Sequence, residues 1–131
     1  MIEFVSIEEY RAMRKGHPGY IYVLIDNAII GKESLIKTIS QGIGSPYSGD
    51  NWDGLDDTLR DLSWIRDNTV CIMHSSLPVL SLKDTSIYFS ILNNTDTSWS
   101  DNPGQNSVCV KIMFDQSLKS ALCFLDRAGD K

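Results

Sequence analysis

The chain has 131 residues, of which 42% are hydrophobic and 22% charged, and its formal net charge is −5. This size and composition are typical of one globular domain that buries about two-thirds of its unfolded surface, so we expect a single domain over residues 1–131. No apolar run approaches the ~18 residues of a membrane span, and the N-terminus lacks the basic region of a signal peptide. These features predict a cytoplasmic protein with no membrane partner. The acidic excess, without a basic stripe, argues against direct nucleic-acid binding.

The first fifteen residues carry a helix signal. Ser6 and Glu9 have the spacing of a capping box, and Tyr10 and Met13 continue an apolar stripe behind them. We therefore expect Ile2–Lys15 to form a helix that docks on the core, within an N-terminal extension over residues 1–19.

Three short apolar runs predict the strands of a buried sheet. They are Tyr20–Ile25, Val70–His74 and Val108–Phe114. The three cysteines, Cys71, Cys109 and Cys123, all lie in apolar runs, so we expect buried free thiols and no disulfide.

Helical patterns separate these strands. Helices are expected at residues 32–40 and 81–94, and the second should turn Leu82, Tyr88, Phe89 and Leu92 inward. Residues 98–107 have the composition of an exposed loop, and a C-terminal helix capped by Asp115 is expected at about 115–128. Strands that alternate with helices pair in parallel, so the predicted fold is α/β, with a small parallel sheet of about three strands packed with helices.

The segment from Ser45 to Asp67 is unusually acidic. It holds six aspartates and two arginines, so its net charge of −4 is most of the −5 of the whole chain. Its apolar residues recur at helical spacing, at Trp52, Leu55, Leu59 and Leu62. Asn51 is the expected N-cap, and Asp53 and Asp57 are neighbours on the outer face. Like charges at this spacing cost a few tenths of a kcal/mol, so we infer that the face binds something positive.

Residues 46–59 also carry a specific pattern, Pro-Tyr-x-Gly-x-Asn-Trp-Asp-x-Leu-x-Asp-x-Leu. This pattern resembles the signature of the barstar family of ribonuclease inhibitors, and the resemblance extends over a core from about residue 20 to about residue 114. It implies an immunity protein or antitoxin, not an enzyme and without a cofactor. The acidic helix and the loop before it would block the active site of a cognate ribonuclease toxin. The inhibitor would be a monomer that forms a 1:1 complex.

The resemblance assigns the binding residues position by position. Asp57 corresponds to the central aspartate of the family, Asp53 to a second contact aspartate, and Tyr47 to an aromatic residue that packs on the enzyme. A ribonuclease site gathers Arg, Lys and His around phosphate oxygens, and carboxylates can replace those oxygens. The expected partner-binding residues are Tyr47, Gly49, Asp50, Asn51, Asp53, Gly54, Asp56 and Asp57.

Three positions depart from the family pattern. Asp56 stands where the best-known inhibitor has a tryptophan, and Ser48 replaces a second aromatic residue. Asn94 aligns with a further contact acid, and Asp96 is close enough to substitute for it, so both are additional candidates. These changes indicate a target ribonuclease that differs from the best-known one.

Two alternatives remain for the acidic residues. Asp50, Asp53 and Asp57 could hold Mg²⁺, but Trp52 and Gly54 occupy positions where an EF-hand loop has ligands, so we expect no metal site. No nucleophile motif accompanies the two histidines, so no catalytic residue is expected. In the second alternative, the chain is a barstar-like binding module for a basic protein that is not a nuclease. Nothing in the sequence separates this alternative from the inhibitor.

Overall fold

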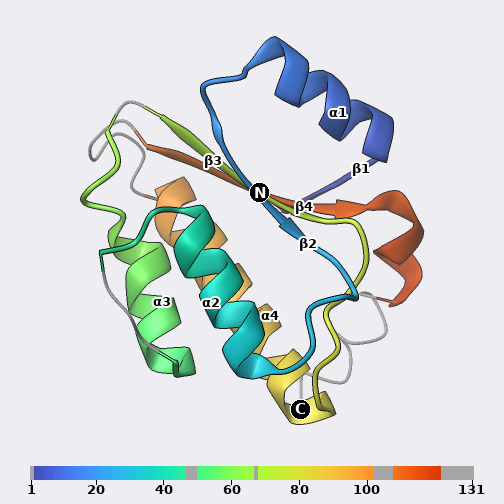
Figure 1. Ribbon diagram of the computed structural model, residues 1–131, viewed down its shortest axis with the longest axis vertical. Coiled ribbons are helices and arrows are strands. Elements are labelled where there is room, and N and C mark those ends of the chain that lie inside the picture. Colours follow the sequence, from blue (N-terminus) through green and yellow to red (C-terminus); the bar gives the residue numbers. More distant parts are fainter. Residues whose placement is uncertain (1, 47–49, 67, 102–107, 122–131) are drawn as a thin grey trace.

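The computed structural model describes residues 2–46, 50–66, 68–101 and 108–121 (Figure 1). Helices and strands alternate along the chain, except that α2 and α3 follow one another. In order they are β1 (Ile2–Val5), α1 (Ile7–Gly16), β2 (Ile21–Ile25), α2 (Lys32–Gly42), α3 (Trp52–Asp61), β3 (Thr69–His74), α4 (Leu82–Asp101), β4 (Cys109–Asp115) and a 3-10 turn, η2 (Gln116–Leu118).

The sheet has four parallel strands in the order β1-β4-β3-β2. The α/β class and the parallel pairing are as predicted, but the expected number of strands was wrong. The missed strand is β1, which pairs with β4 in the register Ile2↔Ile112. A run of four residues is too short to show strand periodicity, and it directly precedes a strong helix signal.

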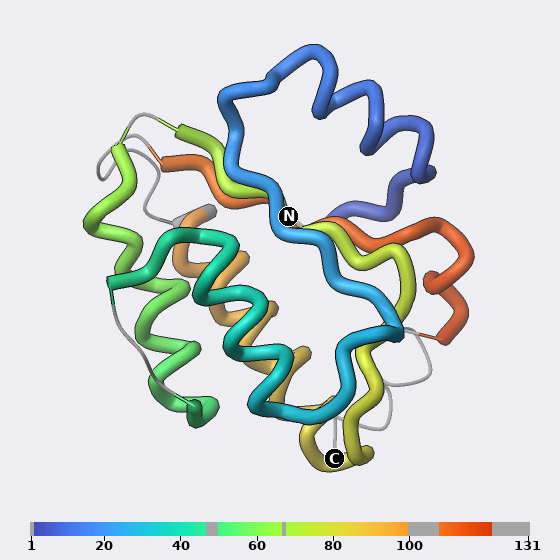
Figure 2. Tube along the Cα trace, in the orientation of Figure 1, coloured from blue at the N-terminus to red at the C-terminus, as the bar shows by residue number. Residues whose placement is uncertain are grey.

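The helices cover both faces of this sheet. Figures 1 and 2 show α2, α3 and α4 on one face and α1 on the other. Alternate residues of β3 therefore enter different clusters. Val70 and Ile72 pack in the large core with the three helices, whereas Cys71 and Met73 pack with Tyr10 of α1. This double cover explains why all six residues of β3 are buried.

Helix α1 begins as the sequence predicts. The Ser6 side chain accepts a hydrogen bond from the Glu9 N–H at 3.0 Å, and Tyr10 is buried. Acidic residues occupy the first turn and basic residues the last turn, which complements the helix dipole. The helix is shorter than the predicted segment because β1 takes its first residues.

Helix α4 differs from its prediction in length and orientation. It continues to Asp101, so the start of the predicted loop at 98–107 is helical, and residues 102–107 lie outside the described part of the chain. Leu82 is 74% exposed, although it was expected inside. Tyr88 and Leu92 are buried as predicted and Phe89 packs against the core, whereas Leu82 is the first residue of α4 and lies before the turns that contact the core.

The two described cysteines differ in burial. Cys71 is a buried free thiol, but Cys109 is exposed because it lies at the start of β4, where α1 does not cover the sheet.

Asp115 caps η2 by accepting a hydrogen bond from the Ser117 N–H, and helical structure continues to Ala121. Cys123 and the rest of the predicted C-terminal helix lie outside the described residues. None of the described helices is both long and apolar enough to cross a membrane.

His74 ends β3 inside the core. Its Nδ1 donates to the Met113 carbonyl at 2.9 Å, which leaves Nε2 to accept from the Tyr88 hydroxyl at 2.6 Å. The ring also stacks on Phe114. Burial lowers the pKa of His74 from 6.5 to about 4, and the same burial raises the pKa of Tyr88. His74 is therefore a neutral structural residue that joins β3, β4 and α4.

We predict that this histidine makes stability depend on pH. Between pH 6.5 and about 4 the unfolded chain binds a proton at this position and the folded chain does not. Stability is therefore lost as the pH falls through this window, by about 3 kcal/mol in total. Urea unfolding at several pH values measures the slope. In the His74→Gln variant, the slope of the unfolding free energy against pH should correspond to close to one proton fewer taken up on unfolding. An unchanged slope would contradict the assignment.

Candidate functional site

Helix α3 begins at a well-formed cap. The Asn51 side chain accepts a hydrogen bond from the Gly54 N–H at 2.7 Å, as the sequence predicts, and Asp53 lies in the first turn. A Cβ atom at Gly54 would lie 3.2 Å from the Asn51 Oδ1 atom, which is a tight contact. Gly54 therefore allows the close approach that sets the direction of α3.

The inner face of α3 is part of the core. Leu55, Leu59 and Leu62 are buried, and Trp52 packs against the same cluster. The helix ends at Asp61, and the following Leu62 has a left-handed backbone with φ 47°, which is uncommon for a residue other than glycine. Burial of the Leu62 side chain offsets this cost and fixes the end of the helix.

Hydrogen bonds from all three tryptophans hold α3 and the segment after it to neighbouring helices. Trp52 Nε1 donates to Asp84 Oδ1 of α4 at 3.1 Å, and Trp99 Nε1 of α4 donates to the Leu59 carbonyl at 2.8 Å. Trp64 Nε1, just beyond α3, donates to the Ile43 carbonyl after α2 at 2.9 Å. The helix is thus attached near both ends, so its outer face has a fixed orientation.

The predicted acidic residues Asp53 and Asp57 lie on that outer face, and Asp50 directly precedes the Asn51 cap. Asp50, Asp53 and Asp57 are exposed, and 80% of the Asp57 side chain is accessible to solvent. Asn51 is exposed beside its cap. Tyr47 and Gly49 lie outside the described residues, and the contacts of all these residues with a partner stay predictions.

Asp56 differs from the other aspartates because it is largely enclosed. Its side chain is 22% exposed, and its Oδ2 atom accepts a hydrogen bond from Arg60 Nη2 at 2.9 Å. The same Arg60 nitrogen lies 3.6 Å from Asp57 Oδ1. Arg60 therefore neutralises Asp56 closely and Asp57 only weakly, an arrangement that the sequence analysis did not foresee.

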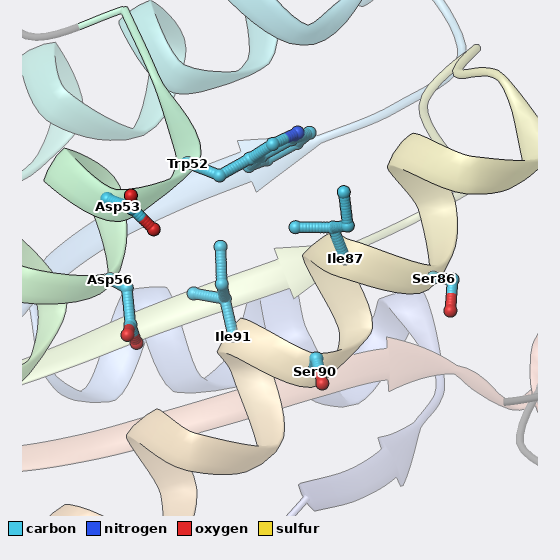
Figure 3. Close-up of a pocket in the computed structure, with 7 residues that line it drawn as sticks. All are labelled: Trp52, Asp53, Asp56, Ser86, Ile87, Ser90 and Ile91. Carbon is cyan, nitrogen blue, oxygen red and sulfur yellow. The ribbon is translucent and has the colours of Figure 1, made fainter. Parts of the chain in front are cut away.

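A small pocket of ≈ 260 Å³ opens between α3 and α4 (Figure 3). Trp52, Asp53 and Asp56 line it from α3. The opposite wall comes from α4 and comprises Ser86, Ile87, Ser90 and Ile91. The sequence analysis missed this wall, whose only signal is a serine followed by an isoleucine, repeated four residues later.

The additional candidates on α4 occupy different positions. Asn94 is exposed and follows Ser90 by four residues, so helical spacing puts it on the side of α4 that forms the pocket. Asp96 is half-buried and lies six residues after Ser90, about 240° around the helix. Spacing therefore favours Asn94 over Asp96 as an additional candidate contact beside the acidic face of α3.

Metal binding receives no support from the described part of the chain. Within it, no group of three or more His, Cys, Asp or Glu side chains has a geometry that could hold a metal ion. Asp53 and Asp57 of α3 are exposed to solvent.

A comparison with known protein families supports the resemblance. The model of the barstar family, described as barnase inhibitors, matches residues 21–114. This chain belongs to the barstar family. No curated protein and no solved structure matches it.

Membership in the barstar family bears out the resemblance. The family consists of inhibitors without enzymatic activity, which agrees with the prediction that the chain is not an enzyme. The matched region runs from the start of β2 into the end of β4 and includes α3 with its acidic face. Strand β1 and helix α1 lie outside it.

We predict that the inner face of α3 governs stability. Leu59 has no exposed surface, so Leu59→Ala should lower the free energy of unfolding by about 2 to 5 kcal/mol. Asp57→Ala should change it by less than about 0.5 kcal/mol because that side chain is exposed. Urea unfolding followed by tryptophan fluorescence measures both values. Equal losses of stability for the two variants would show that the inner face does not contribute more to stability than the outer face.

Proposed function

We propose that this chain is an immunity protein that binds and blocks the active site of a ribonuclease toxin. The observation that carries the proposal is the pair of exposed aspartates, Asp53 and Asp57, on a helix whose other face is fixed in the core, with the exposed Asp50 just before its cap. Membership in a family of barnase inhibitors supports a ribonuclease-inhibitor-like role.

The chemistry of the two surfaces is complementary. A ribonuclease active site concentrates Arg, Lys and His side chains where it binds phosphate groups, and an aspartate carboxylate presents oxygens of similar charge and geometry. Asp57 suits this role best because its side chain is 80% exposed and its Arg60 neighbour is 3.6 Å away. An incoming arginine, lysine or histidine can approach it without first breaking a close ion pair.

The rigidity of α3 favours tight binding. Ordering of a flexible segment on binding costs free energy, whereas α3 is already ordered by its Asn51 cap and its tryptophan hydrogen bonds. The carboxylates therefore lose little conformational entropy beyond their own rotamers. In this account the protein acts as a monomer in the cytoplasm and forms a 1:1 complex with the toxin.

The proposed function makes a prediction about inhibition. We expect the wild-type chain, used to capture proteins from its source organism, to retain a ribonuclease and to abolish its RNA cleavage at a 1:1 ratio, in competition with RNA. The association rate should fall as salt rises, because opposite charges steer the encounter. Chelators should not affect inhibition, because the carboxylates bind cationic side chains.

Three outcomes would overturn this proposal. Loss of ribonuclease activity at far less than one equivalent of inhibitor would indicate that the chain acts catalytically. An association rate that does not depend on salt would show that the acidic face is not the binding surface. A tight basic partner without nuclease activity would favour the alternative of a binding module.

A further prediction of the proposed function concerns individual aspartates. Asp57→Ala should weaken the complex by about 2 to 5 kcal/mol, because a cationic group of the ribonuclease would be buried without its counter-charge. Asp53→Ala should weaken it less. Asp61→Ala is the matched control, since Asp61 is exposed on α3 one turn further along. Titration calorimetry gives the affinities, and circular dichroism checks the fold. Loss of binding in Asp61→Ala but not in Asp57→Ala would mean that another part of α3 docks.

A further inference from the structure

Strand β2 forms one edge of the sheet, and no described element pairs with its outer side. Figure 2 shows it in front of the other strands, with no described helix across it. The Ser75 N–H donates to the Ile25 carbonyl at 3.0 Å, so the main chain of Ile25 points toward β3. Because main-chain groups alternate along a strand, those of Tyr22 and Leu24 point outward, where the described residues offer them no hydrogen bond.

The edge continues beyond β2 at Ile30. This residue pairs with Val79 in a parallel bridge, in which the Val79 N–H donates to Ile29 and the Val79 carbonyl accepts from Gly31, each at 2.8 Å. The N–H and carbonyl of Ile30 therefore point away from Val79. The side chains along this line are apolar and open to solvent, since Leu24 is 42% exposed, Ile30 68% and Val79 49%. The edge thus combines available main-chain groups with exposed apolar surface.

This edge lacks the features that usually protect a strand from pairing. Charged side chains, proline or a covering segment prevent unwanted pairing at the sheet edges of most proteins. The run Tyr20–Ile25 contains neither a charged residue nor a proline. The opposite edge strand, β1, has only 4 residues and carries the exposed Glu3. Of the two edges, β2 is therefore the one that is open to a further strand.

A cationic group beside this edge indicates the charge of a partner. The Arg14 Cζ atom of α1 lies 5.6 Å from the centre of the Tyr22 ring, and Arg14 is exposed. Within the described part of the chain, Arg14 forms no ion pair. The Tyr22 hydroxyl is held 3.0 Å from the Met13 carbonyl oxygen and 2.7 Å from that of His17. A carboxylate on a strand opposite Tyr22 would therefore meet a positive charge over a fixed ring.

We propose that the outer edge of β2 binds an extended segment of a partner protein as an added strand, with an acidic residue near Arg14. Its main chain exchanges hydrogen bonds with Tyr22 and Leu24, and its alternate apolar side chains cover Leu24 and Ile30. A second copy of the chain fits less well, because β2 holds no carboxylate for Arg14 and two chains of net charge −5 repel one another. This surface is separate from α3 and does not depend on the proposed function.

A designed peptide, acetyl-Thr-Val-Thr-Glu-Thr-Val-Thr-amide, tests the edge in the full-length protein. Its Val and Glu side chains share one face of an extended strand, and its sequence is symmetric, so no strand direction is assumed. Hydrogen exchange measured by NMR should slow at least about tenfold at the Tyr22 and Leu24 amides when the peptide binds. Exchange at Val23 and Ile25, which already pair with β3, should not change.

Modified peptides and matched variants locate the contact. N-methylation of alternate peptide residues removes donors from one edge of the peptide only, so methylation of one set should stop binding and methylation of the other should not. Leu24→Glu should weaken binding at least about tenfold, whereas Leu82→Glu, at an exposed position of α4, should not. Replacement of the peptide Glu by Gln should weaken binding several-fold to the wild type and to Arg11→Gln, but not to Arg14→Gln.

Four results would overturn the proposal. The first is that the peptide gives no protection, and the second is that the two methylation patterns, or a variant and its control, have equal effects. Slow exchange of the Tyr22 and Leu24 amides in the free protein at low concentration would show that the chain itself already covers this edge. A sedimentation coefficient that rises with concentration in the wild type but not in Leu24→Glu would assign the edge to a second copy.

Discussion

The attachment of α3 to the core is the constraint on which the rest of the site depends. Leucines on its inner face enter the main cluster, and indole hydrogen bonds join it to α4 at Trp52 and Trp99. Because these contacts fix the rotation of the helix, they also determine which aspartates face outward. The same contacts bring α3 and α4 to the separation at which a small pocket remains between them.

The packing of α3 on the core allows the helix to carry a concentrated negative charge. A free helix with several aspartates would lose stability through repulsion, but here burial of apolar surface outweighs a cost of a few tenths of a kcal/mol per pair. Arg60 reduces the repulsion at Asp56 and leaves Asp57 almost fully exposed. The helix therefore keeps a concentrated negative charge without relying on the partner for its own stability.

Sequence periodicity predicted those parts of the structure that local patterns determine. The Asn51 cap, the inner leucines of α3 and the parallel strands follow from spacing along the chain, and all are present. Strand β1 was missed because four residues carry too little periodicity, and Leu82 was misplaced because it precedes the row that faces the core. The pocket and the Asp56–Arg60 pair depend on how α3 and α4 meet, which no local pattern specifies.

The central claim is that Asp57 directly contacts a cationic group in a ribonuclease active site. A double-mutant cycle tests it most directly, by combining Asp57→Ala with the replacement by alanine of each Arg, Lys and His in the active site of the captured enzyme. We predict a coupling energy of about 1 kcal/mol or more with at least one of these residues, and near zero for the same cycles with Asp61→Ala. Additive effects of Asp57→Ala with every active-site cation would contradict the account.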